Sequence, residues 1–310
     1  MKELLFKTAC LICDSPTSVA FPDLRINGEN DSFSILKCKS CGLGVLSPIP
    51  DDLSEHYEGY HGKRHGFTAK YRARRRVSRL NNVSREDPKE LHLLDVGYGD
   101  GAFLLEADRH GWICVGTERE NNETLRFQQY TDLKSIKLFE PDLKFDAITC
   151  WHTLEHFERP DEVLSSIYDL LADDGVLLIA VPNFAGHQAR LFGKDWLHLD
   201  VPRHLFHFTP ESLGKLLNPN GFTVAQTWHH ESEYDIMGWA QSALNKLFSQ
   251  PNVFFHALSG KALDTGKPAL IANYVLGSIF SLLSIPLVIL GIWKGQGGTI
   301  IVSARKSEVK

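Results

Sequence analysis

The chain has no excess of positive charge. Its 310 residues include 33 lysines and arginines against 38 aspartates and glutamates, and the formal net charge is −5 at pH 7. Proteins that hold nucleic acid neutralise phosphates with clustered basic side chains, so this balance argues against nucleic acid as a partner. The length is sufficient for one large α/β domain and a small additional module.

The start of the chain lacks the features of an export signal. The segment "MKELLFKTACLIC" has no long apolar core and no small-residue cleavage site, whereas secretory signals have both. We therefore expect a cytoplasmic protein. In that reducing compartment, paired cysteines favour a metal site over disulfides.

Charge is also missing near the end of the chain. Residues 269–293, "ALIANYVLGSIFSLLSIPLVILGIW", contain no charged side chain, and their length alone would permit a membrane span. However, the flanking segments 222–228 and 297–306 read as strands of one sheet, and a single crossing could not return the chain to it. Two alternatives follow: a helix bent at Pro286 that makes peripheral contact with the inner membrane face, or a protein-covered cap or dimer contact.

The six cysteines fall into two groups. Cys114 and Cys150 lie in apolar runs and are expected in the core. The other four form two knuckles, "CLIC" and "CKSC", whose spacing is typical of a structural zinc site with four thiolates: Cys10, Cys13, Cys38 and Cys41. We therefore predict a zinc ribbon over residues 1–50, with strands at 32–38 and 42–48.

The rest of the chain divides into a connector and a large domain. Residues 51–88 are predicted to be a helical connector. Its basic run "KYRARRRVSRL" reads either as a solvated helix face or as an attraction to phosphates or anionic membranes. Residues 89–310 alternate strands and helices, which predicts a Rossmann-like α/β fold with a seven-stranded, mostly parallel sheet covered by helices on both faces. We expect an apolar helical insertion at about 232–296, a helix at 121–131, and strands at 91–97, 112–118, 135–139, 145–152, 176–182, 222–228 and 297–306.

A glycine-rich turn follows the first of these strands, in "LLDVGYGDG". Gly97, Gly99 and Gly101 would let the backbone approach a ligand closely, because they carry no Cβ atom. Asp95 would repel a pyrophosphate but suits the cationic amino-acid end of S-adenosylmethionine. Glu118 ends the second strand, where a carboxylate can accept hydrogen bonds from ribose hydroxyls. These residues predict S-adenosylmethionine as the cofactor rather than NAD.

The same residues carry a family resemblance. "LLDVGYGDGAFLLEA" followed by "GWICVGTE" resembles the class I S-adenosylmethionine-dependent methyltransferases over roughly residues 90–230, with Tyr98 where a cysteine is usual. The acid that usually follows the third strand in this family is not evident, and Glu140 and Asp142 are alternatives. Together with the paired cysteines, "HYEGY" and "WLHLDVPRHLFHFTPESL" are similar to a bacterial subgroup with an amino-terminal zinc ribbon.

The resemblance implies methyl transfer to oxygen or carbon. Related enzymes methylate nucleotide sugars or polyprenyl quinol precursors, so we expect a small-molecule or lipid-linked acceptor that is sugar-derived or isoprenoid. RNA methylation and a catalytically idle scaffold that binds the cofactor are the alternatives.

Two groups of histidines are candidates for removing a proton from the acceptor. His152, Glu155 and His156 have the spacing i, i+3, i+4, which places them on one face of a helical turn. His198, His204 and His207 follow the fifth strand, at the same edge of the sheet. Three roles remain open: His152 or His204 as general base, a divalent metal held by the first group, or a purely structural role for Glu155 and His156.

Overall fold

The computed structural model describes residues 9–25, 31–53, 56, 68–84, 90–120, 122, 124–260 and 265–307. The segment "HYEGY", apart from His56, lies outside these residues. The chain forms two compact units. The first unit comprises Met1–Lys63, Pro182–Lys215 and Trp228–Ile300, and the second comprises Arg64–Val181, Leu216–Thr227 and Ile301–Lys310.

A seven-stranded sheet, most of it in the second unit, confirms the predicted fold class. Its order is β10-β11-β8-β7-β4-β5-β6, and β4 pairs in parallel with β5 and β7. The last strand in the chain therefore lies between the fifth and sixth. The strands are β4 (Leu91–Val96), β5 (Trp112–Thr117), β6 (Gln128–Tyr130), β7 (Phe145–Trp151), β8 (Leu171–Pro182), β10 (Phe222–Trp228) and β11 (Thr299–Lys306).

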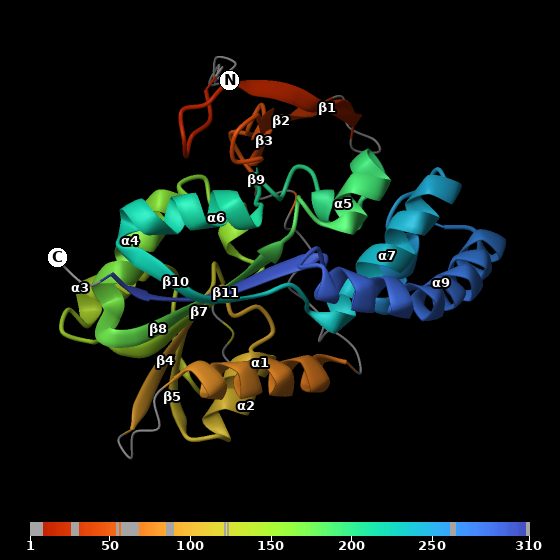
Figure 1. Ribbon diagram of the computed structural model, residues 1–310. Helices are drawn as coiled ribbons and strands as arrows, with labels where there is room; N and C mark the ends of the chain where they lie inside the picture. Colours follow the sequence, from red (N-terminus) through yellow and green to blue (C-terminus); the bar gives the residue numbers. More distant parts are fainter. Residues whose placement is uncertain are drawn as a thin grey trace. The chain divides into compact units, whose positions relative to one another are not determined.

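Helices cover both faces of this sheet. Figure 1 shows α1 (Ala69–Val83) and α2 (Ala102–Asp108) on one side, and α3 (Leu133–Phe139) and α4 (Pro160–Leu170) on the other. The basic run forms most of α1, which buries Ala73, Val77 and Leu80 at helical spacing. The predicted core cysteines, Cys114 and Cys150, are both buried.

The third strand is not where the sequence pattern placed it. Residues 135–139 belong to helix α3, and the predicted helix at 121–131 contains strand β6 instead. The cause is a helix cap, because the carboxylate of Asp132 accepts a hydrogen bond from the backbone N–H of Ser135 at 2.7 Å. Asp132, rather than Glu140 or Asp142, is thus the acid that follows the third strand, and its carboxylate caps α3.

The first unit contains a four-stranded sheet in the order β1-β2-β3-β9. Strands β1 (Thr17–Arg25), β2 (Ser32–Cys38) and β3 (Gly44–Ser47) form antiparallel pairs, and two of them match the predicted ribbon strands. Strand β9 (Phe206–His207) joins the sheet from far along the chain by pairing with Gly44 and Val45. The histidine loop therefore completes the sheet of the cysteine-bearing segment.

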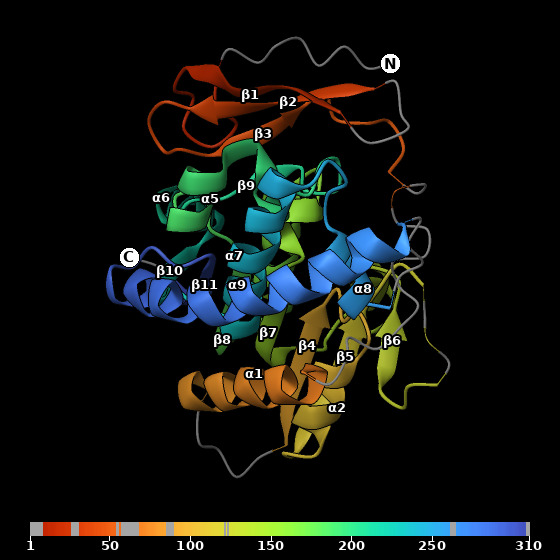
Figure 2. The same ribbon diagram turned by 90° about the vertical axis from the view of Figure 1, so that its right-hand side faces the viewer.

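Helices form the remainder of the first unit. They are α5 (His187–Phe192), α6 (Pro210–Leu217, which begins in this unit), α7 (Ser232–Leu247), α8 (Val253–Leu258) and α9 (Lys267–Trp293). Helices α7 and α9 lie side by side in both views (Figures 1 and 2) and pack around Ala240, Leu244 and Phe254. Helix α9 contains the uncharged segment and continues through Pro286.

Candidate functional site

The loop between β4 and α2 has a backbone that favours glycine. Gly97, Gly99 and Gly101 have φ angles of +75°, +58° and +72°, a region that other residues rarely adopt. A Cβ atom on Gly97 would lie 2.5 Å from Cγ2 of Thr153, and one on Gly101 would lie 2.7 Å from Leu125. A Cβ atom on Gly99 would meet no atom within 4 Å. Gly99 therefore faces open space, where a ligand could approach the backbone.

Glu118 is tied to this loop by its carboxylate. The backbone N–H of Gly99 donates to Oε2 at 2.9 Å, and that of Arg119 donates to Oε1 at 3.0 Å. The end of β5 thus places a partly exposed carboxylate beside the glycine turn. This is the juxtaposition that the sequence predicted for a group able to bind ribose hydroxyls.

Asp95 lies at the buried end of β4, with a side chain that is 2% exposed. Its Oδ1 accepts a hydrogen bond from the Thr149 hydroxyl of β7 at 2.6 Å. Burial raises the pKa of Asp95 to about 7, although the Thr149 hydrogen bond and the nearby Arg76 oppose that shift. The carboxyl group therefore titrates near neutral pH.

A pocket opens beside Asp95 and the glycine turn. Its lining includes Arg72, Arg76, Asp95, Tyr98, Asp100 and Trp151. The guanidinium of Arg76 lies 4.7 Å from the centroid of the Trp151 ring. Oδ2 of Asp100 is buried and has no hydrogen-bond partner among the described residues.

Two arginines of α1, Arg72 and Arg76, thus belong to the candidate cofactor site. They were not predicted from the sequence. The available signal was their i, i+4 spacing in the basic run, which places both on one face of the helix. Acidic and basic groups together fit the amino-acid end of S-adenosylmethionine, because that end carries both an ammonium and a carboxylate.

Tyr98, within the glycine turn, packs its side chain toward β6. Its hydroxyl donates to Oε1 of Gln129 at 2.6 Å, and its ring meets Phe127 edge-on at 5.2 Å between centroids. A Cβ atom on Gly116 would lie 2.5 Å from the Tyr98 ring. The residue that replaces the usual cysteine therefore helps to hold the turn in place.

His152, Glu155 and His156 lie just after β7, and residues Leu154–His156 form a 3-10 turn. His152 has a φ of +55°, and its Nδ1 lies 3.8 Å from Oε1 of Glu155, which is fully buried. Thr153, between them, is the residue against which Gly97 packs. The turn therefore adjoins the glycine loop. His152 lies near Glu155, but the helical turn expected to include it begins only at Leu154.

The second group of candidate histidines belongs to the first unit: His198, His204 and His207. His204 Nδ1 lies 2.9 Å from the carbonyl oxygen of His198, and its Nε2 lies 3.6 Å from Oδ2 of Asp200. His207 Nε2 lies 2.9 Å from the carbonyl oxygen of Leu199, and burial lowers the pKa of His207 to about 4. His207 is consequently neutral at pH 7.

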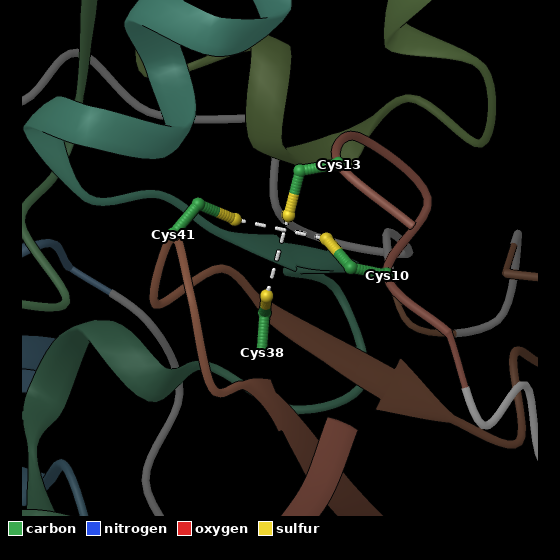
Figure 3. Close-up of side chains that lie close together, drawn as sticks. All are labelled: Cys10, Cys13, Cys38 and Cys41. Atoms are coloured by element: carbon green, nitrogen blue, oxygen red, sulfur yellow. Dashed lines mark hydrogen bonds between the residues drawn. The ribbon is translucent and has the colours of Figure 1, made fainter. Parts of the chain in front are cut away.

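The four predicted cysteine ligands converge on one point (Figure 3). The Sγ atoms of Cys10 and Cys41 are 3.6 Å apart and those of Cys13 and Cys38 are 3.5 Å apart. All four lie within 4.8 Å of one another. Tetrahedral zinc with Zn–S bonds of about 2.3 Å places its sulfurs about 3.8 Å apart, so the cluster fits this ion.

Comparison with known families agrees with the methyltransferase chemistry that the glycine loop indicates. A family model described as "Methyltransferase domain" matches residues 65–227. The chain belongs to the methyltransferase domain family. This confirms the predicted methyltransferase at the level of the family. Residues 10–41 lie outside the match, and the zinc-ribbon subgroup stays a prediction.

Several curated relatives carry the name ubiquinone biosynthesis O-methyltransferase. The protein of Haemophilus ducreyi is 29% identical over 133 residues, which cover 37% of this chain and 56% of the relative. The chain thus spans about half the length of that relative. The protein of Glaesserella parasuis is 22% identical over 176 residues, covering 50% of this chain and 71% of the relative.

Among solved structures, a SAM-dependent methyltransferase from Archaeoglobus fulgidus is similar with a TM-score of 0.47 and 20% identity. That comparison covers 82% of this chain and 100% of the other.

Proposed function

We propose that the protein transfers the methyl group of S-adenosylmethionine to oxygen or carbon of a small-molecule or lipid-linked acceptor. The observation that carries the proposal is the turn at Gly97, Gly99 and Gly101, which lies between a buried Asp95 and the Glu118 carboxylate. The family match supports this chemistry.

The chain offers separate groups for the ribose and for the amino-acid end of the cofactor. Glu118 would accept hydrogen bonds from the ribose hydroxyls, and the bare backbone at Gly99 would allow close approach. Asp95 and Asp100 would face the ammonium of the amino-acid end, and Arg72 and Arg76 its carboxylate. When bound, S-adenosylmethionine supplies an activated methyl group and its leaving group.

His152 is the general base that the geometry favours. It belongs to the same compact unit as the glycine loop, and the buried Glu155 lies close enough to orient its imidazole and to stabilise the imidazolium form. His204 is the second candidate for this role. A divalent metal held by His152, Glu155 and His156 is the alternative in which these groups orient a substrate hydroxyl.

The name of these relatives supports a quinol-type acceptor with an isoprenoid tail, and a sugar-derived acceptor is the alternative. A peripheral contact with the inner membrane face through residues 269–293 would bring a cytoplasmic enzyme to such a lipid. Zinc at Cys10, Cys13, Cys38 and Cys41 would be structural, because four thiolates complete its tetrahedral shell.

The experiment is a binding measurement followed by a transfer assay. Calorimetry on zinc-loaded protein should show binding of S-adenosylhomocysteine and none of NAD. Radiolabelled methyl groups should then pass to a polyprenylated catechol. Transfer only to a nucleotide sugar would favour the sugar-derived acceptor, and transfer to RNA would contradict the acceptor class. Binding without transfer to any of them would favour the scaffold, and the absence of binding would overturn the proposal.

A further inference from the structure

Helix α9 exposes its large apolar side chains and buries smaller or polar ones, which is the reverse of a surface helix in a water-soluble protein. The residues that it buries are mostly small or polar: Asn273, Gly277, Ser284, Val288 and Gly291. Its large apolar side chains are exposed instead, among them Ile271, Val275, Ile279, Leu282, Leu283, Ile285, Ile289, Leu290, Ile292 and Trp293. In an aqueous protein the pattern runs the other way.

The buried stripe of α9 fits against its neighbours in the first unit. A Cβ atom on Gly277 would lie 2.7 Å from the ring of Phe254 in α8, so only glycine permits this approach. Leu276 and Phe280 pack on the cluster formed by Ala240, Leu244 and Phe254. One side of α9 is therefore held by protein, as Figure 2 shows for its neighbours α7 and α8.

Three polar side chains along α9 donate hydrogen bonds to the backbone of the same helix, whereas Oδ1 of Asn273 is buried without a hydrogen-bond partner among the described residues. The hydroxyl of Ser278, an exposed residue, donates to the carbonyl oxygen of Tyr274 at 2.8 Å, and that of Ser281 donates to Gly277 at 2.7 Å. The Asn273 amide donates to the carbonyl oxygen of Ala269 at 2.9 Å. Such bonds remove the need for water, which hydrocarbon surroundings do not provide.

The ends of the helix differ from its middle. Lys267 begins the helix, and Trp293, which is 82% exposed, is followed by Lys294. Tryptophan and lysine favour the boundary between hydrocarbon and water, where an indole or an ammonium can reach the headgroups. The exposed stripe through Val275, Ile279, Leu282 and Ile289 lies between these ends.

We infer that α9 is a membrane-docking helix that lies in the plane of one leaflet, with its exposed face in the hydrocarbon and its buried stripe on α7 and α8. This deepens the proposed membrane contact and rests on it. Helix α9 is about 40 Å long, enough to cross a bilayer, and its most apolar window has a mean hydropathy of 2.4. The chain nevertheless leaves from β10 and returns to β11, which are neighbours in one sheet, so both ends of α9 stay on the same side.

A second copy of the chain is the competing occupant of this face. Protein interfaces combine an apolar centre with a polar rim, and arginine is enriched in them. The exposed face of α9 has no charged side chain from Pro268 to Trp293. A continuous uncharged surface with lysines only at its ends matches a leaflet better than a protein partner.

Vesicle binding by the full-length, zinc-loaded protein tests the inference. The protein should sediment with phosphatidylcholine vesicles, and high salt should not release it, because the attraction is hydrophobic. Leu282→Asp and Ile289→Asp should each weaken vesicle binding about tenfold or more. Leu138→Asp, on α3, is the matched control because Leu138 is 74% exposed against 69% for Leu282; it should bind like the wild type.

Depth measurements decide the orientation of α9. The fluorescence of Trp293, taken as the difference between the native chain and Trp293→Phe, should be quenched by lipids brominated near the headgroups. The fluorescence that Ile271→Trp adds to the Trp293→Phe background should be quenched by the same lipids. Quenching from opposite leaflets would overturn the planar arrangement. A dimer in lipid-free buffer that Leu282→Asp dissociates, without vesicle binding by the native chain, would assign the face to a second copy. Binding of S-adenosylhomocysteine, measured on the same samples, separates failure of the docking helix from failure of the proposed methyl transfer.

Discussion

The backbone N–H of Gly99 donates to Oε2 of Glu118 at 2.9 Å, which links the turn after β4 to the end of β5. These two residues follow different strands of the sheet, and their contact creates one edge of the proposed cofactor site. The hydrogen bond also aligns the carboxylate, so that its remaining lone pairs can meet a ribose.

Glu118→Ala should therefore weaken binding of S-adenosylhomocysteine. Hydrogen bonds to a charged acceptor contribute about 1.5–3 kcal/mol each, so the dissociation constant should rise at least about tenfold. Isothermal titration calorimetry measures this change. Glu120→Ala, two residues along the same loop, should leave the affinity unchanged, and equal effects of both substitutions would remove Glu118 from the site.

Alanine substitutions at the glycines of the turn should differ in their effects on stability and on ligand affinity. Gly97→Ala places a Cβ atom 2.5 Å from Thr153, so it should lower the free energy of unfolding by about 1–3 kcal/mol. Gly99→Ala meets no neighbour, so its smaller cost to stability should accompany a larger loss of ligand affinity. Urea unfolding and calorimetry separate the two effects. Gly214→Ala, in α6 with open space around it, is the control that should not destabilise the protein.

The pH dependence of stability should reveal the buried acid. The pKa of Asp95 is about 7 in the folded protein and about 3.9 when unfolded. Between these values the folded state binds a proton that the unfolded state does not, so the free energy of unfolding falls as pH rises. Relative to Asp95→Asn, the native protein should lose about 1.4 kcal/mol per pH unit between roughly pH 4 and 7.

Urea unfolding at several pH values measures that difference. Asp142→Asn, which changes an exposed carboxylate, is expected to follow the native protein throughout. Parallel curves for Asp95→Asn and the native protein would show that burial does not perturb Asp95.

His152 should affect turnover rather than cofactor binding. His152→Ala is expected to lower kcat by about 10²–10⁴-fold, the usual contribution of a general base, with an unchanged affinity for S-adenosylhomocysteine. Glu155→Gln should shift the acidic limb of the pH–rate profile to lower pH, because the imidazolium loses a neighbouring charge. If only His204→Ala gives the loss of kcat, the base lies on the other histidine loop.

Zinc removal should loosen more than the cysteine knuckles. The Thr209 hydroxyl donates to the carbonyl oxygen of Cys41 at 2.7 Å, and β9 pairs with β3 beside it. Cys38→Ser or chelation should lower the Tm by about 10 °C or more, since structural zinc contributes directly to folding. Amide hydrogen exchange at Phe206 and His207 should accelerate at the same time.

Two measurements give this prediction a control. Metal analysis should find one zinc per chain in the native protein and in Lys39→Ala, whose side chain is exposed within the second knuckle. Unchanged exchange at Phe206 after complete metal removal would show that the histidine loop is independent of the zinc.

Features that depend on neighbouring residues could be predicted from the amino-acid sequence. The period of apolar positions specified six of the seven strands, because alternation and buried runs are local properties of a strand. The turn at Gly97, Gly99 and Gly101 and the spacing of the two cysteine knuckles likewise indicated their chemistry, since each motif places its atoms within a few residues. The prediction of a third strand at 135–139 was wrong. That apolar run also suits a helix, and the cap at Asp132 favours the helix.

Features that need partners distant in the chain became visible only in the folded structure. It placed Arg72 and Arg76 in the pocket beside Asp95, and it added β9 to the sheet of the cysteine segment. It also determined which side of α9 is buried, a choice that the absence of charged residues from Pro268 to Trp293 leaves open. Pairing and packing between remote segments depend on the shapes of both surfaces, and no local pattern records that complementarity.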